Sequence, residues 1–284
     1  MDFSRRLAMA CAIICVAAVF SGACVWKVAP ERPLVWTPMD GTDAAATAVE
    51  ARRALVRGLY ASARAKLVTP ERDTVFSEEL AIRAPCAFRI TVLGLFDRPQ
   101  AYLASNCEEI AMHDVGSRRF FTGTIEQGMM LDQFPVPLKA EEIVASLLGI
   151  PYGFAEAAAG GEATGPIEDP QKRGWRVEHR GAGAAETDIY WFDSETHHPV
   201  RWARSGPRGE FVAVEWDQWG PASGSWAIEL PRIVRIALIQ RGLMLELAFR
   251  DVEMNPGDLD ESLFTLKPPR GITPEPLGQP GLAQ

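Results

Sequence analysis

The residue types that carry acid–base or metal chemistry are present, but their spacing gives no catalytic pattern. His197 and His198 are adjacent, and on a strand they would point to opposite faces, so they could not hold one metal ion. The paired acids at 108–109 and 141–142 are typical of solvated surfaces. Segment 181–186 nearly matches a dinucleotide-binding loop, but it ends in Glu and joins two expected strands with no helix. The sequence therefore predicts a protein that is not an enzyme and that needs no metal and no cofactor.

The N-terminus indicates a different chemistry, the lipidation of a cysteine. Two arginines at 5–6 precede an apolar run from Leu7 to Phe20, and the small residues 21–23 come directly before Cys24. This order is typical of a secretory signal peptide, and its junction with Cys24 resembles the lipobox of bacterial lipoproteins. We expect a signal peptide over 1–23 and a lipid on Cys24. Two alternatives stay open, which are ordinary cleavage near residue 23 and an uncleaved anchor about 20 residues long.

Two further cysteines would lie outside the cytoplasm in each of these cases. Cys11 and Cys15 belong to the signal segment, so Cys86 and Cys107 form an even pair in an oxidising compartment. The expected hairpin between them brings both near the same end, which favours a Cys86–Cys107 disulfide. The alternative is two reduced, buried thiols.

Composition excludes some classes of partner. The chain has 284 residues, 47% of them hydrophobic, and a formal net charge of −8. An acidic chain has no general attraction for the phosphate backbone of nucleic acid. We therefore expect no nucleic-acid partner, and we expect a chain with enough apolar residues for a sizeable core.

Patterns of period two dominate the remainder of the chain and predict a mainly β (α+β) fold. A proline-containing tether is expected over 24–42, one domain over 43–268, and a disordered Pro/Gly-rich tail over 269–284. Helices are expected at 43–58 and 139–148, and an Ala/Gly-rich surface excursion at 155–172. The expected strands are 60–68, 74–83, 86–95, 100–107, 109–115, 118–122, 175–180, 186–192, 199–204, 210–219, 232–239 and 243–252. Such a series with tight turns predicts a strongly curved antiparallel sheet.

Two apolar features indicate binding. Leu95 and Phe96 occupy a hairpin tip, where turn residues are normally polar, so the tip is expected to contact a membrane; the alternative is that it folds back onto the domain. Many tryptophans fall in the second strand set, which is either an ordinary core or the wall of a ligand cavity. The residues expected to line that cavity are Phe88, Ile90, Val92, Met129, Met130, Ile143, Leu147, Trp191, Trp202, Trp216, Leu245 and Leu247.

The order of elements resembles the LolA/LolB-like lipoprotein-carrier family over about residues 50–269. The more particular features are the run 93–96 (Leu-Gly-Leu-Phe) between two strands and the run 134–138 (Phe-Pro-Val-Pro-Leu) before a helix ending at Gly149. The closing run 263–269 (Leu-Phe-Thr-Leu-Lys-Pro-Pro) is similar to the F-x-L-x-x-P finish of the family. The cysteine pair and the excursion at 155–172 depart from the family pattern.

The resemblance implies an open, unclosed β-barrel with helices covering its concave side, which binds acyl chains of lipoproteins or lipids. Membrane-anchored members receive lipoproteins from a periplasmic carrier protein and insert them into the outer membrane, and Leu95 or Phe96 matches the protruding apolar residue that assists insertion. Val25 follows the lipidated cysteine instead of Asp, which implies an outer-membrane protein on the periplasmic face. Relatives also include signalling regulators that bind peptides, so a protein- or peptide-binding envelope assembly or signalling module is the alternative.

Overall fold

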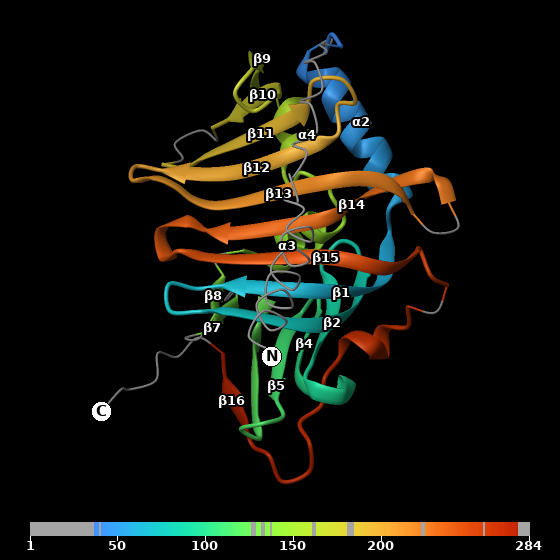
Figure 1. Cartoon of the computed structure of the whole chain (residues 1–284), viewed down its shortest axis with the longest axis vertical. Helices are drawn as coiled ribbons and strands as arrows, with labels where there is room; N and C mark the ends of the chain where they lie inside the picture. The colour runs from blue at the N-terminus through green and yellow to red at the C-terminus, as the bar shows by residue number, and fades with distance from the viewer. Residues whose placement is uncertain are drawn as a thin grey trace, which may run out of the picture. The chain divides into compact units, whose positions relative to one another are not determined.

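A single large sheet organises the structure. The computed structural model describes residues 37–39, 41–125, 129–131, 134–136, 138–160, 163–180, 185–222, 225–257 and 259–277, all within the unit Val35–Gln284. Fourteen strands form the sheet in the order β16-β6-β5-β4-β3-β2-β1-β15-β14-β13-β12-β11-β10-β9 (Figure 1). Neighbours in the described sheet are antiparallel, except that β16 runs parallel to β6. The sheet does not close on itself within these residues, which confirms the expected open, unclosed barrel.

The strands of the first half are β1 Gly58–Val68, β2 Asp73–Arg83, β3 Ala87–Leu93, β4 Pro99–Asn106, β5 Glu109–Asp114 and β6 Arg119–Thr124. The strands of the second half are β9 Ala163–Asp169, β10 Gly174–His179, β11 Thr187–Asp193, β12 Pro199–Gly206, β13 Gly209–Ala222, β14 Ser225–Leu238 and β15 Leu243–Met254, whereas β16 Pro274–Pro276 pairs with β6 at the edge of the first half. A separate two-stranded sheet pairs β7 Met129–Leu131 with β8 Phe134–Val136. Since β1 pairs with β15, the two halves join at the centre of the large sheet.

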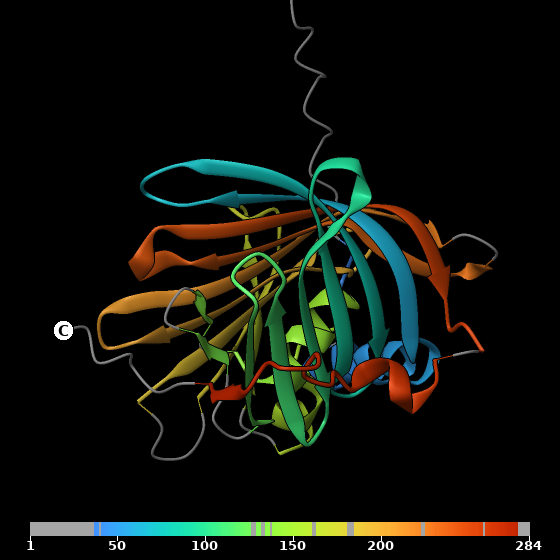
Figure 2. The same cartoon turned by 90° about the horizontal axis from the view of Figure 1, so that it is seen from below.

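The helices lie against the inner face of the curved sheet. Among the described residues they are α2 Thr42–Leu55, α3 Ala140–Leu147 and α4 Phe154–Ala159; the short 3-10 turns η1 Leu95–Asp97, η3 Ile239–Arg241 and η4 Glu261–Phe264 lie elsewhere in the chain. Figure 2 shows α3 and α4 inside the curl of the sheet. Residues of all three helices share one core cluster with the inward side chains of the strands. In the described part of the chain, no helix has the length and apolar character that crossing a bilayer requires.

The alternation along each strand separates a concave face from an outer face. On β2, Leu80 and Ile82 belong to the main core with the helices, whereas Ala81 packs on the other side with Phe264 of η4. The same two-sidedness holds on β11, where Tyr190 joins the main core and Trp191 a separate cluster. Both faces of the sheet are therefore partly buried, the concave face by the large main core and the outer face by smaller clusters.

The first helix ends earlier than the sequence predicts, at Leu55 rather than near Gly58. Gly58 starts β1 instead. A Cβ at this position would come within 2.5 Å of the carbonyl oxygen of Ile82, so the absence of a side chain allows close strand contact and does not mark a helix end.

The expected surface excursion at 155–172 is wrong only for its first part, because residues 163–169 are mainly exposed although they form a strand. Residues 154–159 form α4, whose Phe154, Ala155, Ala157 and Ala158 are buried, and residues 163–169 form the edge strand β9. The Ala/Gly composition indicated a loop because small residues give no clear period, yet small side chains are what allow α4 to pack closely against α2.

The expected disordered tail over 269–284 also needs correction where the structure describes it. Residues 274–276 pair with β6, and Leu277 is buried. Prolines at 274 and 276 are compatible with an edge strand, where some backbone N–H groups need no partner.

Candidate functional site

The centre of the concave face is built from small side chains. Ala61, Ala63 and Ala65 alternate along β1 and are all buried. Larger apolar residues flank them, since Ala65 is paired with Phe76 on one side and with Leu247 on the other. All three alanines belong to the main core, so the middle of the curve is covered by neighbouring side chains, with larger apolar residues on either side.

One part of this concave wall remains accessible. A set of apolar side chains packs against the core but is only half-buried, and by register they all face the same side as Leu80 and Leu247. We call this the open apolar set; its members are Phe76, Ile90, Leu103, Phe121, Ile236, Leu243 and Leu245. Half-exposed apolar walls on a concave surface are the usual setting for apolar ligands.

Helix α3 is held against the opposite part of the wall by directed hydrogen bonds. Arg52 of α2 donates to the carbonyl oxygens of Leu148 (2.9 Å) and Gly149 (3.0 Å), just beyond the C-terminus of α3. The indole of Trp216 donates to the carbonyl oxygen of Ser146 at 2.7 Å. A cation near the last carbonyls of a helix is favourable, and burial lowers the pKa of Arg52 to about 10.

A buried ion pair connects α3 to the second half of the sheet. Arg204 of β12 contacts Glu142 of α3 at 2.9 Å and Asp188 of β11 at 2.8 Å. Glu142 also accepts a hydrogen bond from the backbone N–H of Lys139 at 2.8 Å, and the indole of Trp202 donates to Asp188 at 3.0 Å. Burial opposes the charge of Arg204, but the two carboxylates outweigh it and raise the pKa of that guanidinium. The carboxylate of Glu142 is therefore satisfied although it is buried.

Glu78 is a second buried acid of the concave face, in a very different environment. It lies opposite Ala63 of β1 and Val92 of β3, and it is 5% exposed. Burial raises the pKa of this carboxyl to about 7. No hydrogen bond or neighbouring charge from the described residues offsets that effect.

The tip of the β3–β4 hairpin is the most exposed apolar feature of the described residues. Leu95 is 83% exposed and Phe96 is 91% exposed. Phe96 and Asp97 have φ values of 60° and 54°, a left-handed conformation that side-chain-bearing residues rarely adopt. Figure 2 shows this teal tip projecting on the side away from the helices. The tip does not fold back onto the domain.

The outer face carries a surface hollow of about 530 Å³ with a different character. Its lining combines the charged residues Glu79, Arg89, Asp251 and Glu253 with apolar residues such as Val252 and Leu263, so it carries charges that the open apolar set lacks. Among the described residues, no group of three His, Cys, Asp or Glu side chains is placed to hold a metal ion.

Solved structures share this architecture at low sequence identity. A DUF1329 family protein from Desulfovibrio piger aligns with a TM-score of 0.54 and 11% identity, covering 79% of this chain and 95% of the other. A Vibrio parahaemolyticus domain described as outer membrane lipoprotein-sorting aligns with a TM-score of 0.53 and 10% identity, covering 77% and 94%. The fold is LolA/LolB-like. A LolA superfamily protein from Nitrosomonas europaea aligns at 0.48 and 9% identity, covering 78% and 97%.

No protein-family model matches the chain, and no curated protein matches it. At sequence identities of 9–11%, the similarity to these structures extends to the LolA/LolB-like fold and not to individual residues. The residues that could bind a ligand must therefore be argued from their own geometry.

The structure brings together most of the residues that the sequence places in a cavity. Six are buried in the main core of the LolA/LolB-like fold, namely Phe88, Ile143, Leu147, Trp202, Trp216 and Leu247. Ile90 and Leu245 belong to the open apolar set, and Val92 is half-buried opposite Glu78. The aromatic residues thus form core more than they form an accessible wall.

Trp191 lies apart from the other cavity candidates. It is paired with Arg201, and it packs with Ala203 and Ala213 on the outer face, whereas Trp202 is paired with Tyr190 on the concave face. The guanidinium of Arg201 lies 4.7 Å from its ring centroid. A residue on that face cannot line the concave wall.

Three sequence candidates cannot be placed. Cys24 lies outside the described residues, and only the backbone of Met129 and Met130 is described, in β7. Sequence reasoning missed Glu78 and Arg204. The signal for Glu78 was present, because it alternates with Phe76, Leu80 and Ile82 and is the one charged member of that series.

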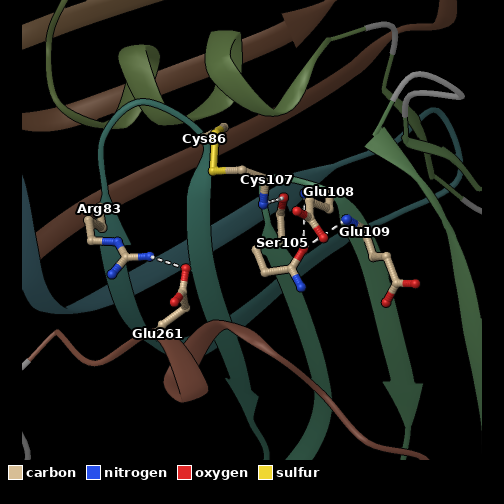
Figure 3. The surroundings of a disulfide bond; sticks show 8 residues. Arg83, Cys86, Ser105, Cys107, Glu108, Glu109 and Glu261 are labelled. Atoms are coloured by element: carbon tan, nitrogen blue, oxygen red, sulfur yellow. Dashed lines mark hydrogen bonds and ion pairs between the residues drawn. A yellow bond between two sulfur atoms is a disulfide. The ribbon is translucent and has the colours of Figure 1, made fainter.

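The expected disulfide is present and lies at the end of the β3–β4 hairpin opposite the tip (Figure 3). The sulfur atoms of Cys86 and Cys107 are 2.00 Å apart and their Cα atoms 5.2 Å. The side chain of Asn106 accepts hydrogen bonds from the backbone N–H groups of Glu108 (3.0 Å) and Glu109 (2.8 Å). The bridge therefore covalently fixes one end of the hairpin that carries Leu95 and Phe96 at its other end.

Proposed function

We propose that this protein binds acyl chains of lipoproteins or lipids on the concave face of its sheet, for their transfer to or insertion into a membrane. The observation that carries the proposal is the open apolar set, which offers half-buried hydrocarbon contacts on the inside of a curved sheet. Covering this set with roughly two or three acyl chains would remove several hundred Å² of apolar surface from water, on the order of 10 kcal/mol before ordering costs. That is sufficient for reversible, non-enzymatic transfer.

The cellular setting belongs to the same proposal. We place the protein on the periplasmic face of the outer membrane, anchored by a lipid on Cys24, with the signal peptide 1–23 removed and the tether 24–42 linking the anchor to the domain. The Cys86–Cys107 bridge is consistent with an oxidising compartment. The similarity in fold to a domain described as outer membrane lipoprotein-sorting supports the same setting, and a periplasmic carrier protein would deliver the cargo.

The exposed tip would provide the contact with the membrane. Leu95 and Phe96 present their apolar side chains almost entirely to solvent. A pair of this kind gains free energy when it enters a lipid surface. In this proposal the tip touches the bilayer while the concave face holds the cargo.

The first experiment is native mass spectrometry of the Cys24→Ser soluble form purified from the periplasm. We expect a co-purifying acyl-containing molecule that delipidation removes and that a fluorescent fatty acid replaces. Leu103→Asn on the concave face should weaken binding of that fatty acid, whereas Tyr102→Asn, one residue along on the outer face, should not. A protein that is empty and leaves the fatty acid unbound would refute the proposal and favour the protein- or peptide-binding envelope module.

A further inference from the structure

Glu78 is a carboxyl group set in an apolar part of the concave wall. Its neighbours two residues along β2 are Phe76 and Leu80, and its cross-strand partners are Ala63 and Val92. Of these, Phe76 belongs to the open apolar set and Val92 is half-buried. The carboxyl therefore lies at the edge of the surface that we propose holds the acyl chain.

Nothing in the described structure explains this carboxyl as a stabilising group. Glu142, the other buried acid of this face, accepts a backbone hydrogen bond and pairs with Arg204. Glu78 has neither kind of partner among the described residues, and burial is the one effect that acts on its ionisation there. Glu78 is 5% exposed, so its carboxyl has little contact with water, and a carboxyl that is largely desolvated and lacks a protein partner is penalised when it ionises; a partner supplied by a ligand would reduce that penalty.

We propose that Glu78 is a specificity-determining residue that hydrogen-bonds an N–H or O–H donor carried by the acyl ligand. This inference rests on the proposed function. The ionised carboxylate can only accept hydrogen bonds, whereas the protonated carboxyl can also donate one. Where Glu78 is ionised, the favoured occupant is then a long-chain molecule with an amide, hydroxyl or ammonium group near its chain, and a molecule of the same length with acceptors alone is disfavoured.

The donor requirement follows from the asymmetry of buried polar groups. When Glu78 is ionised, a ligand that brings a donor satisfies it, whereas a ligand with acceptors alone covers the carboxylate and leaves it unpaired; the protonated carboxyl can instead donate its O–H to such an acceptor. Sites built around a buried hydrogen-bonding group discriminate strongly against ligands that lack the matching group. The apolar residues around Glu78 would hold the chain of either ligand equally.

The test compares ligands of one chain length in displacing a bound fluorescent fatty acid from the Cys24→Ser protein. The donor probes are dodecanamide, 1-dodecanol and dodecylamine, and the acceptor-only probe is methyl dodecanoate. At pH 8.5, where Glu78 is ionised, we expect at least one donor probe to displace the fatty acid at a concentration about tenfold lower than methyl dodecanoate does. The donor probe that binds best identifies the kind of head group.

Variants of two adjacent acids provide the controls. Glu78→Leu should abolish the preference for donor probes and leave methyl dodecanoate binding intact or stronger. Glu78→Gln keeps an acceptor oxygen and should keep part of the preference. Glu79→Leu, on the outer face of the same strand, should behave like the unsubstituted protein.

The outcomes separate the two proposals. Equal binding of donor and acceptor-only probes by the unsubstituted protein, or an unchanged preference in a folded Glu78→Leu variant, would overturn the role of Glu78 while acyl binding stands. If none of the probes displaces the fatty acid, or the fatty acid itself does not bind, the proposed function fails and the inference fails with it.

Discussion

Burial of Glu78 has a consequence for stability that does not require a ligand. A carboxyl whose pKa is about 7 when folded, against an ordinary value near 4.3, binds its proton more tightly in the folded state. The folded state is then penalised as the pH rises through this interval, by on the order of 3 kcal/mol once the pH is above both values. Below the unfolded pKa the penalty is absent.

We therefore predict that Glu78→Gln raises the free energy of unfolding above pH 7 and changes it little below pH 4.5. Urea denaturation of both proteins between pH 4 and pH 8.5 measures the difference. Glu79→Gln serves as the matched control, since it lies on the other face of the strand. A Glu78→Gln effect that does not vary with pH would contradict the raised pKa.

Substitution of the buried cation Arg204 is expected to lower the free energy of unfolding, in contrast to substitution of Glu78. Arg204→Met leaves Glu142, whose side chain is 2% exposed, and Asp188 without their counter-ion, which we expect to destabilise the protein by about 3–5 kcal/mol. Arg235→Met removes a more exposed pair with Glu246 and should cost about 1 kcal/mol or less. Equal losses in chemical denaturation of the two variants would show that the buried network has no special importance.

At the residue scale, side-chain type could be predicted more readily than the face it occupies. Alternation along β2 places Phe76, Leu80 and Ile82 on one side, and this is confirmed. Knowing which residues of β11 face the concave side does not predict which residues of β12 do so, because a bulge near Trp191 and the turn between the strands change the register. Trp191 and Trp202 therefore look equivalent in the sequence and lie on opposite faces.

The β3–β4 hairpin is the element whose stability is easiest to test. The Cys86–Cys107 bridge spans a sequence separation of 21 residues, and closing a loop of that size restricts the unfolded chain by about 3 kcal/mol. We predict that the double variant Cys86→Ser with Cys107→Ser loses about this amount in urea denaturation. Reduction of the unsubstituted protein should give a similar loss. No change in either experiment would mean that the bridge does not constrain the unfolded state.

Element assignment from sequence succeeded where the hydrophobic period was long and failed where residues were small. The strands of the first half and α3 were predictable from their period and their turn residues. Helix α4 and strand β9 were not, because their sequence contains mainly Ala, Gly, Pro and acidic residues. Their structure comes from tertiary packing against α2 and β10, which a local pattern does not contain.

At the scale of the whole molecule, the exposed tip at Leu95 and Phe96 is expected to make the contact with a lipid surface. Replacing Leu95 and Phe96 together by Glu should lower binding to phospholipid vesicles by at least about tenfold, since burial of two such side chains contributes a few kcal/mol. Co-sedimentation of the Cys24→Ser form with vesicles measures this. The free energy of unfolding should not change, because both side chains are solvent-exposed.

Val75→Glu is the matched control for the tip. Val75 is an apolar residue that is 48% exposed, on strand β2 and away from the tip. If Val75→Glu reduces vesicle binding as much as the tip variant does, general apolar exposure rather than the tip governs membrane contact.

The fold class could be predicted from the sequence, but the strand order at the centre of the sheet could not. The pairing of β1 with β15 joins segments nearly two hundred residues apart, for example Leu59 with Met254. Hairpins follow from adjacent strands and turn residues, whereas this contact depends on the curvature of both halves and on the small residues of β1. The concave face exists because of that one long-range pairing.

The open sheet has a mechanical consequence. In a closed barrel, the number of strands and their stagger fix the bore. Here β9 and β16 stand at opposite ends of the strand order, so the described strands form no continuous ring of backbone hydrogen bonds that would set a diameter. Small changes in twist shared among many strand pairs can alter the radius of curvature without breaking a ladder. We therefore expect the curvature of this open sheet to be less tightly fixed than the bore of a closed barrel.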